Sequence, residues 1–192
     1  MTVGSIYIIS TDLIFANLIQ VSTMELDILS EKIKDVGLID NEKIAIKELK
    51  NLIDIHQELI EVSEKLNEMF SPFQLINSFG SIVALCTGCF LAVSGIRPYF
   101  IAKFFMFPIF IPAIIFTQCY FSQLLIDSST AISASAYNIE WYSKSVKFQK
   151  LLLVIIIKAQ KPQTITALKF FDMSLEIFQW VTLQFYLNNH HN

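Results

Sequence analysis

Three cysteines and three histidines are the side chains of this 192-residue chain best suited to metal or redox chemistry. Cys86 and Cys89 have the C-x-x-C spacing that zinc sites and dithiol redox sites use. A zinc site of this kind needs a second pair of Cys or His, and neither stands nearby in the sequence. Both thiols, like Cys119, lie inside apolar stretches. We therefore expect buried structural thiols, with no metal site and no cofactor.

The histidines and acids form no catalytic grouping. His56 falls on an apolar helical stripe and is expected to be a packing histidine, whereas His190 and His191 belong to a polar, solvated tail. Membrane hydrolases and desaturases need clustered His, Asp or Ser-His pairs, and none shares one helical face here. The sequence thus argues against an enzyme, and its net charge of −3 gives no indication of a nucleic-acid partner.

The elements that carry these side chains are expected to be membrane helices. No Asp, Glu, Lys or Arg occurs in residues 69–96 or in residues 104–126. Each stretch exceeds the roughly 20 residues that a helix needs to cross the hydrocarbon of a bilayer. Only 16% of the residues are charged, against about 25% in ordinary soluble domains. The predicted fold class is all-α: a polytopic transmembrane helical bundle with cytosolic helical extensions, in contact with membrane lipid.

The charge pattern sets the expected order of segments. They are a partial transmembrane helix (1–24), a cytosolic amphipathic helical segment (25–68), two transmembrane helices (69–96 and 97–127), a second cytosolic segment (128–164), a final, truncated transmembrane helix (165–187) and a tail (188–192). Lysines gather in the two long polar segments, and the positive-inside rule places both in the cytosol. Asp12 is either a functional acid within the first span or an acid near a helix end or paired inside the bundle. We favour the structural role.

Both cytosolic segments have helical signatures. Apolar residues recur three and four apart from Leu49 to Phe70, which predicts an amphipathic helix whose apolar face packs on other cytosolic helices of the same protein. Asp40 and Glu42 suit the start of that helix. The apolar run Leu151 to Ile157 is too short to span a membrane, so it is expected in a cytosolic helix that ends before Pro162.

The two uncharged stretches differ in amino-acid composition. The first has small residues four apart, which predicts a face for close helix packing. They are Gly80, Ala84, Gly88 and Ala92. The second contains Pro108 and Pro112 among many phenylalanines. Prolines kink a helix, so this stretch either opens an apolar pocket or simply presents bulk to lipid.

Several stretches are similar to the insect odorant receptor family, most closely between Ala136 and Gln179. They are Ala136-Tyr137, Trp141-Tyr142, Lys150-Leu151-Leu152, Ala159-Gln160-Lys161-Pro162, Leu168-Lys169-Phe170, Met173-Ser174-Leu175-Glu176 and Phe178. Leu85-Cys86 with Phe90, and Gln118-Cys119 with Tyr120-Phe121, are weaker matches upstream. The resemblance covers nearly the whole chain, but its specific motifs lie in the last third.

The resemblance implies a multi-pass protein of the plasma membrane with seven transmembrane helices. Members of the family assemble with a shared co-receptor subunit into odour-gated cation channels that serve olfaction. The spans of this chain would then be helices four to seven. The charged helix of residues 25–68 and the segment Asp127–Thr164 would belong to a cytosolic anchor. Because the sequence starts within helix four and departs from the family after Phe178, we expect a partial chain. Its final helix has about 22 Å of apolar length, so we expect no odour-gated current from these 192 residues by themselves.

The resemblance also implies three sets of site residues. The odorant would contact aromatic residues at the start of helix six, namely Phe100, Phe104, Phe105 and Phe107. Pore-lining positions would lie on one face of the last helix, at Gln179, Thr182, Leu183 and Tyr186. Subunit contact and gating would involve Tyr137, Trp141, Lys161, Pro162 and Ser174. The alternatives are lipid contact for the phenylalanines and ordinary intrachain packing for the last set.

Two other functions stay open at this point. The chain could be a relative of the gustatory receptors, although the Ala159–Pro162 and Met173–Glu176 stretches resemble odorant receptors more closely. It could also be a non-conducting membrane assembly fragment that packs through its cytosolic helices.

Overall fold

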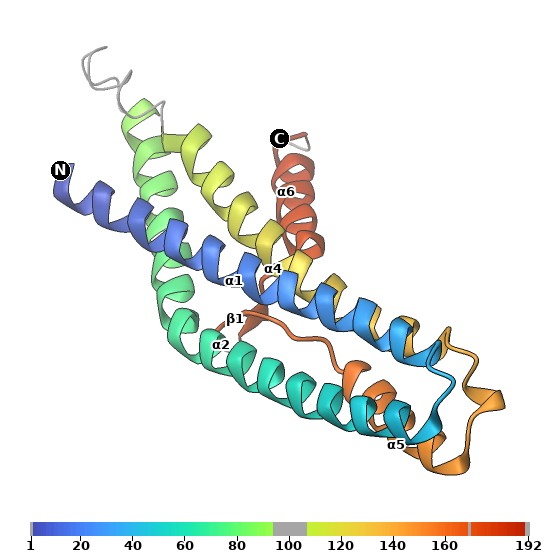
Figure 1. Cartoon of the computed structure of the whole chain (residues 1–192). Coiled ribbons are helices and arrows are strands. Elements are labelled where there is room, and N and C mark those ends of the chain that lie inside the picture. The colour runs from blue at the N-terminus through green and yellow to red at the C-terminus, as the bar shows by residue number, and fades with distance from the viewer. Residues whose placement is uncertain (1, 94–106, 169, 191–192) are drawn as a thin grey trace. The chain divides into compact units, whose positions relative to one another are not determined.

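The computed structural model describes residues 2–93, 107–168 and 170–190, which are almost entirely helical. The elements are α1 (Thr2–Gly37), α2 (Glu42–Val93), α4 (Phe107–Tyr137), η1 (Trp141–Ser143), α5 (Val146–Ala159), β1 (Thr166–Ala167), β2 (Phe171–Asp172) and α6 (Leu175–His190) (Figure 1). The helical fold class predicted from the sequence is confirmed. The chain forms two compact units, Met1–Asn67 with Gln123–Thr164 and Glu68–Ser122 with Ile165–Asn192.

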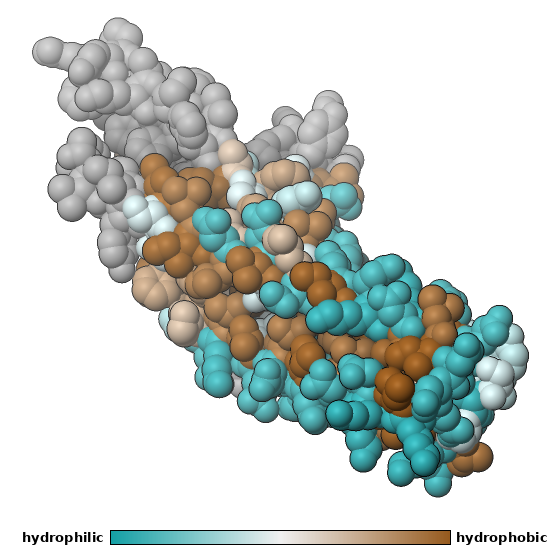
Figure 2. Space-filling view, viewed as in Figure 1, coloured by the Kyte–Doolittle hydropathy of each residue, from teal (hydrophilic) through white to brown (hydrophobic). Residues whose placement is uncertain are grey.

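The core of the first unit comes from helical stripes on α1, α2, α4 and α5. Their buried side chains recur three or four residues apart, the spacing that keeps them on one face of a helix. The largest are Phe15, Ile19, Leu26, Leu29, Ile33, Leu49, Leu125, Ile132, Phe148, Leu152 and Ile155. The predicted stripe of α2 is buried at Leu49, Leu52 and His56. The face visible in Figure 2 carries many hydrophilic side chains, with hydrophobic patches between them.

The helix ends in the first unit have local causes. α1 ends at Gly37, where a Cβ atom would overlap the side chain of Ile139, so this close approach requires glycine. At the start of α2, the Asn41 Oδ1 accepts hydrogen bonds from the amides of Lys43 (3.1 Å) and Ile44 (3.5 Å). The predicted start between Asp40 and Glu42 is therefore confirmed, with Asn41 as the capping residue.

α5 shows the same agreement with sequence. Ser145 caps the helix by accepting a hydrogen bond from the Phe148 amide at 3.4 Å. The helix ends at Ala159, as expected for a helix that stops before Pro162.

The second unit contains a β-hairpin that the sequence pattern did not indicate. β1 and β2 are antiparallel and pair Thr166 with Asp172 and Ala167 with Phe171. The described residues of this segment, 165–168 and 170–174, which the sequence pattern grouped with the final transmembrane helix, are therefore not helical. The helix α6 begins at Leu175. Ser174 caps it, because its Oγ accepts a hydrogen bond from the Ile177 amide at 3.3 Å.

Membrane-compatible surface is present in the described part of the chain. By length and composition, one of its helical stretches is able to cross a membrane, Ile9–Gly37, with a mean hydropathy of 1.3. The uncharged stretches 69–96 and 104–126 both extend into residues 94–106, outside the described ranges. In α2, a Cβ atom on Gly80 would meet nothing within 4 Å, so this part of the small-residue face is open in the chain.

Candidate functional site

An aromatic cluster lies where α4 ends and η1 begins. The rings of Tyr137 and Trp141 are tilted with centroids 6.3 Å apart, and those of Trp141 and Tyr142 meet edge-on at 6.2 Å. Tyr137 and Tyr142 remain 65% and 69% exposed. We call these three residues the tip cluster. Two of the five predicted subunit-contact residues, Tyr137 and Trp141, are therefore brought together, with aromatic surface free to meet a partner.

The backbone beneath the tip cluster is fixed by side-chain hydrogen bonds. Trp141 Nε1 donates to the carbonyl of Tyr137 at 3.2 Å. The side-chain Nε2 of Gln149 donates to the carbonyls of Trp141 (3.3 Å) and Lys144 (3.0 Å). Lys144 Nζ donates to the carbonyl of Ile39 at 2.9 Å, in the connection between α1 and α2. The exposed rings thus stand on a well-tied loop, a form of preorganisation that lowers the entropic cost of binding.

The remaining predicted contact residues lie elsewhere. Lys161 and Pro162 are exposed and follow the end of α5, whose 14 residues span about 21 Å from its start beside η1. Ser174 belongs to the second unit, where it caps α6. Tyr137 and Trp141 are thus the two of the five predicted residues that the structure brings together.

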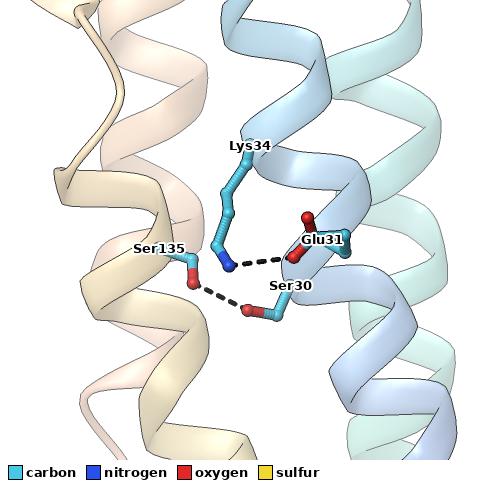
Figure 3. Close-up of polar contacts among 4 residues, drawn as sticks. All are labelled: Ser30, Glu31, Lys34 and Ser135. Atoms are coloured by element: carbon cyan, nitrogen blue, oxygen red, sulfur yellow. Dashed lines mark hydrogen bonds and ion pairs between the residues drawn. The ribbon is translucent and has the colours of Figure 1, made fainter.

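One buried and one part-buried polar link join helices of the first unit, and sequence reasoning missed both as pairs. The hydroxyls of Ser30 in α1 and Ser135 in α4 are 2.7 Å apart and buried (Figure 3). Beside them, Lys34 and Glu31 pair at 2.9 Å on the exposed side of α1 (Figure 3). The serine pair fixes the register of two helices at 105 residues of separation, whereas the exposed ion pair contributes little.

The second link joins α2 and α5. Lys158 Nζ donates a hydrogen bond to Gln57 Oε1, next to His56, which is only 1% exposed. Burial first, and then repulsion from the Lys158 ammonium, lower the pKa of His56 below its usual 6.5. His56 is therefore a neutral residue of the core, as its place on the apolar stripe predicted.

In the second unit, one serine holds the hairpin that precedes α6. Ser71 Oγ in α2 accepts a hydrogen bond from the Leu168 amide at 2.5 Å and lies 3.5 Å from Thr166 Oγ1. Leu168 has a φ of 46°, in the left-handed region. Nothing in the local sequence indicates this contact, except that a buried Ser before Pro72 is an unusual residue in an apolar helix.

α6 carries the predicted pore-lining positions. The ring of Phe178 meets Phe116 of α4 edge-on at 5.4 Å, which attaches α6 to α4. Gln179, Thr182 and Leu183 are exposed, and the side chain of Tyr186 lies outside the described part. At about 100° per residue, the four positions centre about a quarter-turn from Phe178. Their face of α6 is thus not the one that packs on α4.

The predicted odorant contacts fall largely outside the described residues. Phe100, Phe104 and Phe105 lie in residues 94–106, and Phe107 is the first residue of α4, with an undescribed side chain. Among the described residues no group of three or more His, Cys, Asp or Glu is arranged to hold a metal ion. The expectation that every cysteine is buried is wrong for Cys86, which is exposed, and right for Cys119.

These features define a class of protein: a helical bundle that contains a helix able to cross a membrane and a helical unit with a charged outer face. A family model for the seven-transmembrane odorant receptors matches residues 1–185. The chain therefore belongs to the seven-transmembrane odorant receptor family, whose members are membrane proteins.

The similar proteins are insect receptors. The chain is 26% identical to Odorant receptor 85b of Drosophila melanogaster over 166 residues, which is 86% of this chain and 43% of that protein. It is 31% identical to the putative odorant receptor 92a of the same fly over 137 residues, or 71% and 33%. The structure of olfactory receptor OR5 from Machilis hrabei in complex with eugenol superimposes with a TM-score of 0.79 at 19% identity, covering 93% of this chain and 46% of that one. The chain spans less than half the length of these relatives.

Proposed function

We propose that this chain is part of the ligand-tuned subunit of a heteromeric, odour-gated cation channel in the plasma membrane of an olfactory neuron. The observation that carries the proposal is the match to the odorant receptor family along residues 1–185, together with a shared fold at a TM-score of 0.79. The Machilis hrabei receptor binds eugenol in its solved complex, which makes a small aromatic odorant a reasonable first probe. Residues 100–107 would contribute to the odorant site, and α6 would line the pore through Gln179, Thr182, Leu183 and Tyr186.

Whole-cell recording tests this function. The full-length product of the gene is expressed with an odorant receptor co-receptor subunit, and the cells are exposed to a panel of odorants that includes eugenol. We expect odour-evoked cation currents whose odour tuning differs from that of the co-receptor alone. Equal responses with and without this protein, while surface labelling shows both subunits at the plasma membrane, would overturn the proposal.

The tip cluster would supply a contact between subunits in the cytosol. Exposed aromatic rings on a fixed backbone are typical binding hot spots. Trp141→Ala should lower co-purification with the co-receptor, and Tyr137→Ala should do the same without removing the Trp141 Nε1 hydrogen bond to the Tyr137 carbonyl. The matched control is Tyr120→Ala, another exposed tyrosine in contact with a neighbouring ring. Undiminished co-purification of both tip variants would contradict a contact role for the cluster.

A further inference from the structure

The hairpin of residues 165–173 is a strained connection. It is closed by hydrogen bonds from the Met173 amide to the Ile165 carbonyl (2.8 Å) and from the Phe170 amide to the Ala167 carbonyl (3.0 Å). Between them, Leu168 has a φ of 46°, a left-handed conformation that few residues other than glycine adopt. Such a conformation persists only where the surrounding structure imposes it.

Ser71 supplies that constraint. A serine hydroxyl is able to accept one hydrogen bond and donate another. Here the Ser71 hydroxyl accepts a hydrogen bond from the amide of the strained Leu168 at 2.5 Å. Thr166 Oγ1, in β1, lies 3.5 Å from the same hydroxyl. Ser71 is only 6% exposed, so water has little access to replace it.

Ser71 also differs from Ser81 and Thr87, two other hydroxyl residues of its helix. Ser81 and Thr87 donate to the carbonyls of Asn77 and Val83 four residues earlier, at 2.7 and 2.8 Å. That local bond is the usual arrangement for Ser and Thr within a helix. Ser71 instead reaches a segment 97 residues away in sequence.

Three buried apolar side chains set the rest of the hairpin in place. Ile165, Ala167 and Met173 are at most 1% exposed, whereas Leu168 and Phe170 are 46% and 78% exposed. Apolar burial therefore holds the strands, whereas Leu168 in the turn is largely exposed. The hydrogen bond from the Leu168 amide to Ser71 Oγ fixes the turn on α2, and we call this hydrogen bond the clamp.

We propose that Ser71 is a positioning residue for gating: by holding the turn at Leu168 it couples movement of α2 to the start of α6. α2 is continuous from Glu42 to Val93 and leads into the region assigned to odorant binding, while α6 begins two residues after Met173. The inference rests on the proposed channel function, and it names the residue through which the ligand-binding and pore-forming parts communicate.

The test uses whole-cell recording of the full-length receptor with its co-receptor. Three variants are compared: Ser71→Ala, which removes the clamp; Ser71→Thr, which retains a hydroxyl; and Ser81→Ala, which removes a hydroxyl that bonds only within α2. The readouts are the odorant concentration for half-maximal current and the maximal current per surface-labelled receptor. Surface labelling separates gating from folding.

We expect Ser71→Ala to raise the half-maximal concentration about fivefold, the change in an equilibrium constant that about 1 kcal/mol produces. Ser71→Thr and Ser81→Ala should stay within about twofold of the wild type, a shift of about 0.4 kcal/mol. If Ser71→Ala does not reach the surface, Ser71→Cys takes its place, because a thiol is a weaker acceptor of similar size.

The outcomes separate the two proposals. A wild-type receptor that responds to odorant, with Ser71→Ala indistinguishable from it, overturns the clamp and leaves the channel function intact. A shift of equal size in Ser81→Ala also overturns the clamp, since it would reflect general loss of hydroxyl groups. A wild-type receptor with no odour-evoked current overturns both.

Discussion

The two halves of α2 solve opposite solvation problems within one continuous helix. In residues 42–68 the buried stripe is mainly apolar, with His56 and Ser63 as polar members, and the outer face is charged, as at Lys50 and Glu61. In residues 69–93 the exposed face is apolar instead. Ile76, Phe79 and Phe90 are 64–71% exposed, while Phe70, Ser71 and Gln74 are buried. We therefore expect the first half to face water and the second to face lipid or further apolar helices, and we call them the water-facing and lipid-facing halves.

The contrast also decides in which half a buried polar side chain indicates a role in packing or function. In water-facing helices a buried hydroxyl is one detail among many charges. The lipid-facing half carries no charged residue, so a buried Ser or Gln is among its few strongly polar groups. Intramembrane polar groups commonly serve packing or function. The clamp at Ser71 belongs to this second class.

The largest loss of stability is expected from creating a cavity in the core of the water-facing half. Leu49→Ala removes a side chain that is 0% exposed and should destabilise the protein by about 2–5 kcal/mol. The adjacent Lys50→Ala, on the exposed face, should change stability by at most about 0.5 kcal/mol. Denaturant unfolding of the purified protein in detergent measures both. Equal effects would mean that the α2 stripe is not a core.

A charge on the lipid-facing half sharpens the comparison. Ile76 is 70% exposed, so in a water-soluble protein Ile76→Lys would be harmless. Facing hydrocarbon, the lysine should oppose insertion by about 2.5–3.5 kcal/mol. The control is Glu61→Lys, an exposed site in the other half. Surface expression and glycosylation mapping report insertion, and normal insertion of Ile76→Lys would show that this face meets water or a polar partner.

The parts of the fold that sequence predicted are those with local causes. The α2 stripe, its start near Asn41 and the end of α5 before Pro162 follow from helical periodicity, capping amides and proline. The hairpin did not follow, because two strands of two residues each carry no periodic signal. Its support at Ser71 and the Ser30–Ser135 pair join positions about a hundred residues apart, which no local pattern encodes.

The candidate sites divide in the same way. Sequence resemblance identified Tyr137 and Trp141, and their rings meet across the turn between α4 and η1, with centroids 6.3 Å apart. It also grouped Lys161, Pro162 and Ser174 with them, although these lie at other positions of the fold. Motif order in sequence does not establish distance in space.

A smaller effect is expected at the Ser30–Ser135 pair. Ser30→Ala leaves the buried Ser135 hydroxyl without its partner and should destabilise the protein by about 1–3 kcal/mol. The double variant Ser30→Ala/Ser135→Ala should cost less than the sum of the single variants, since neither hydroxyl is left alone. Lys34→Ala, which breaks the neighbouring exposed ion pair, is the control and should cost under about 1 kcal/mol. Strict additivity of the serine variants would contradict a coupled pair.

The smallest expected effect is a pH dependence confined to the water-facing half of α2. His56 is neutral in the fold because burial and the Lys158 ammonium lower its pKa below 6.5, whereas the unfolded chain takes up a proton near that value. Its contribution to stability is therefore complete above pH 6.5 and is lost as the pH falls toward the lower pKa of the folded state. One proton limits the slope to about 1.4 kcal/mol per pH unit. Residues 69–93 contain no Asp, Glu, Lys, Arg or His, so the lipid-facing half should contribute no dependence over this range.

Denaturant unfolding between pH 7.5 and 5.5 should show a loss of stability that His56→Leu abolishes. Lys158→Gln should reduce the loss by removing the repulsion, and an unchanged pH profile in His56→Leu would assign the dependence to another group.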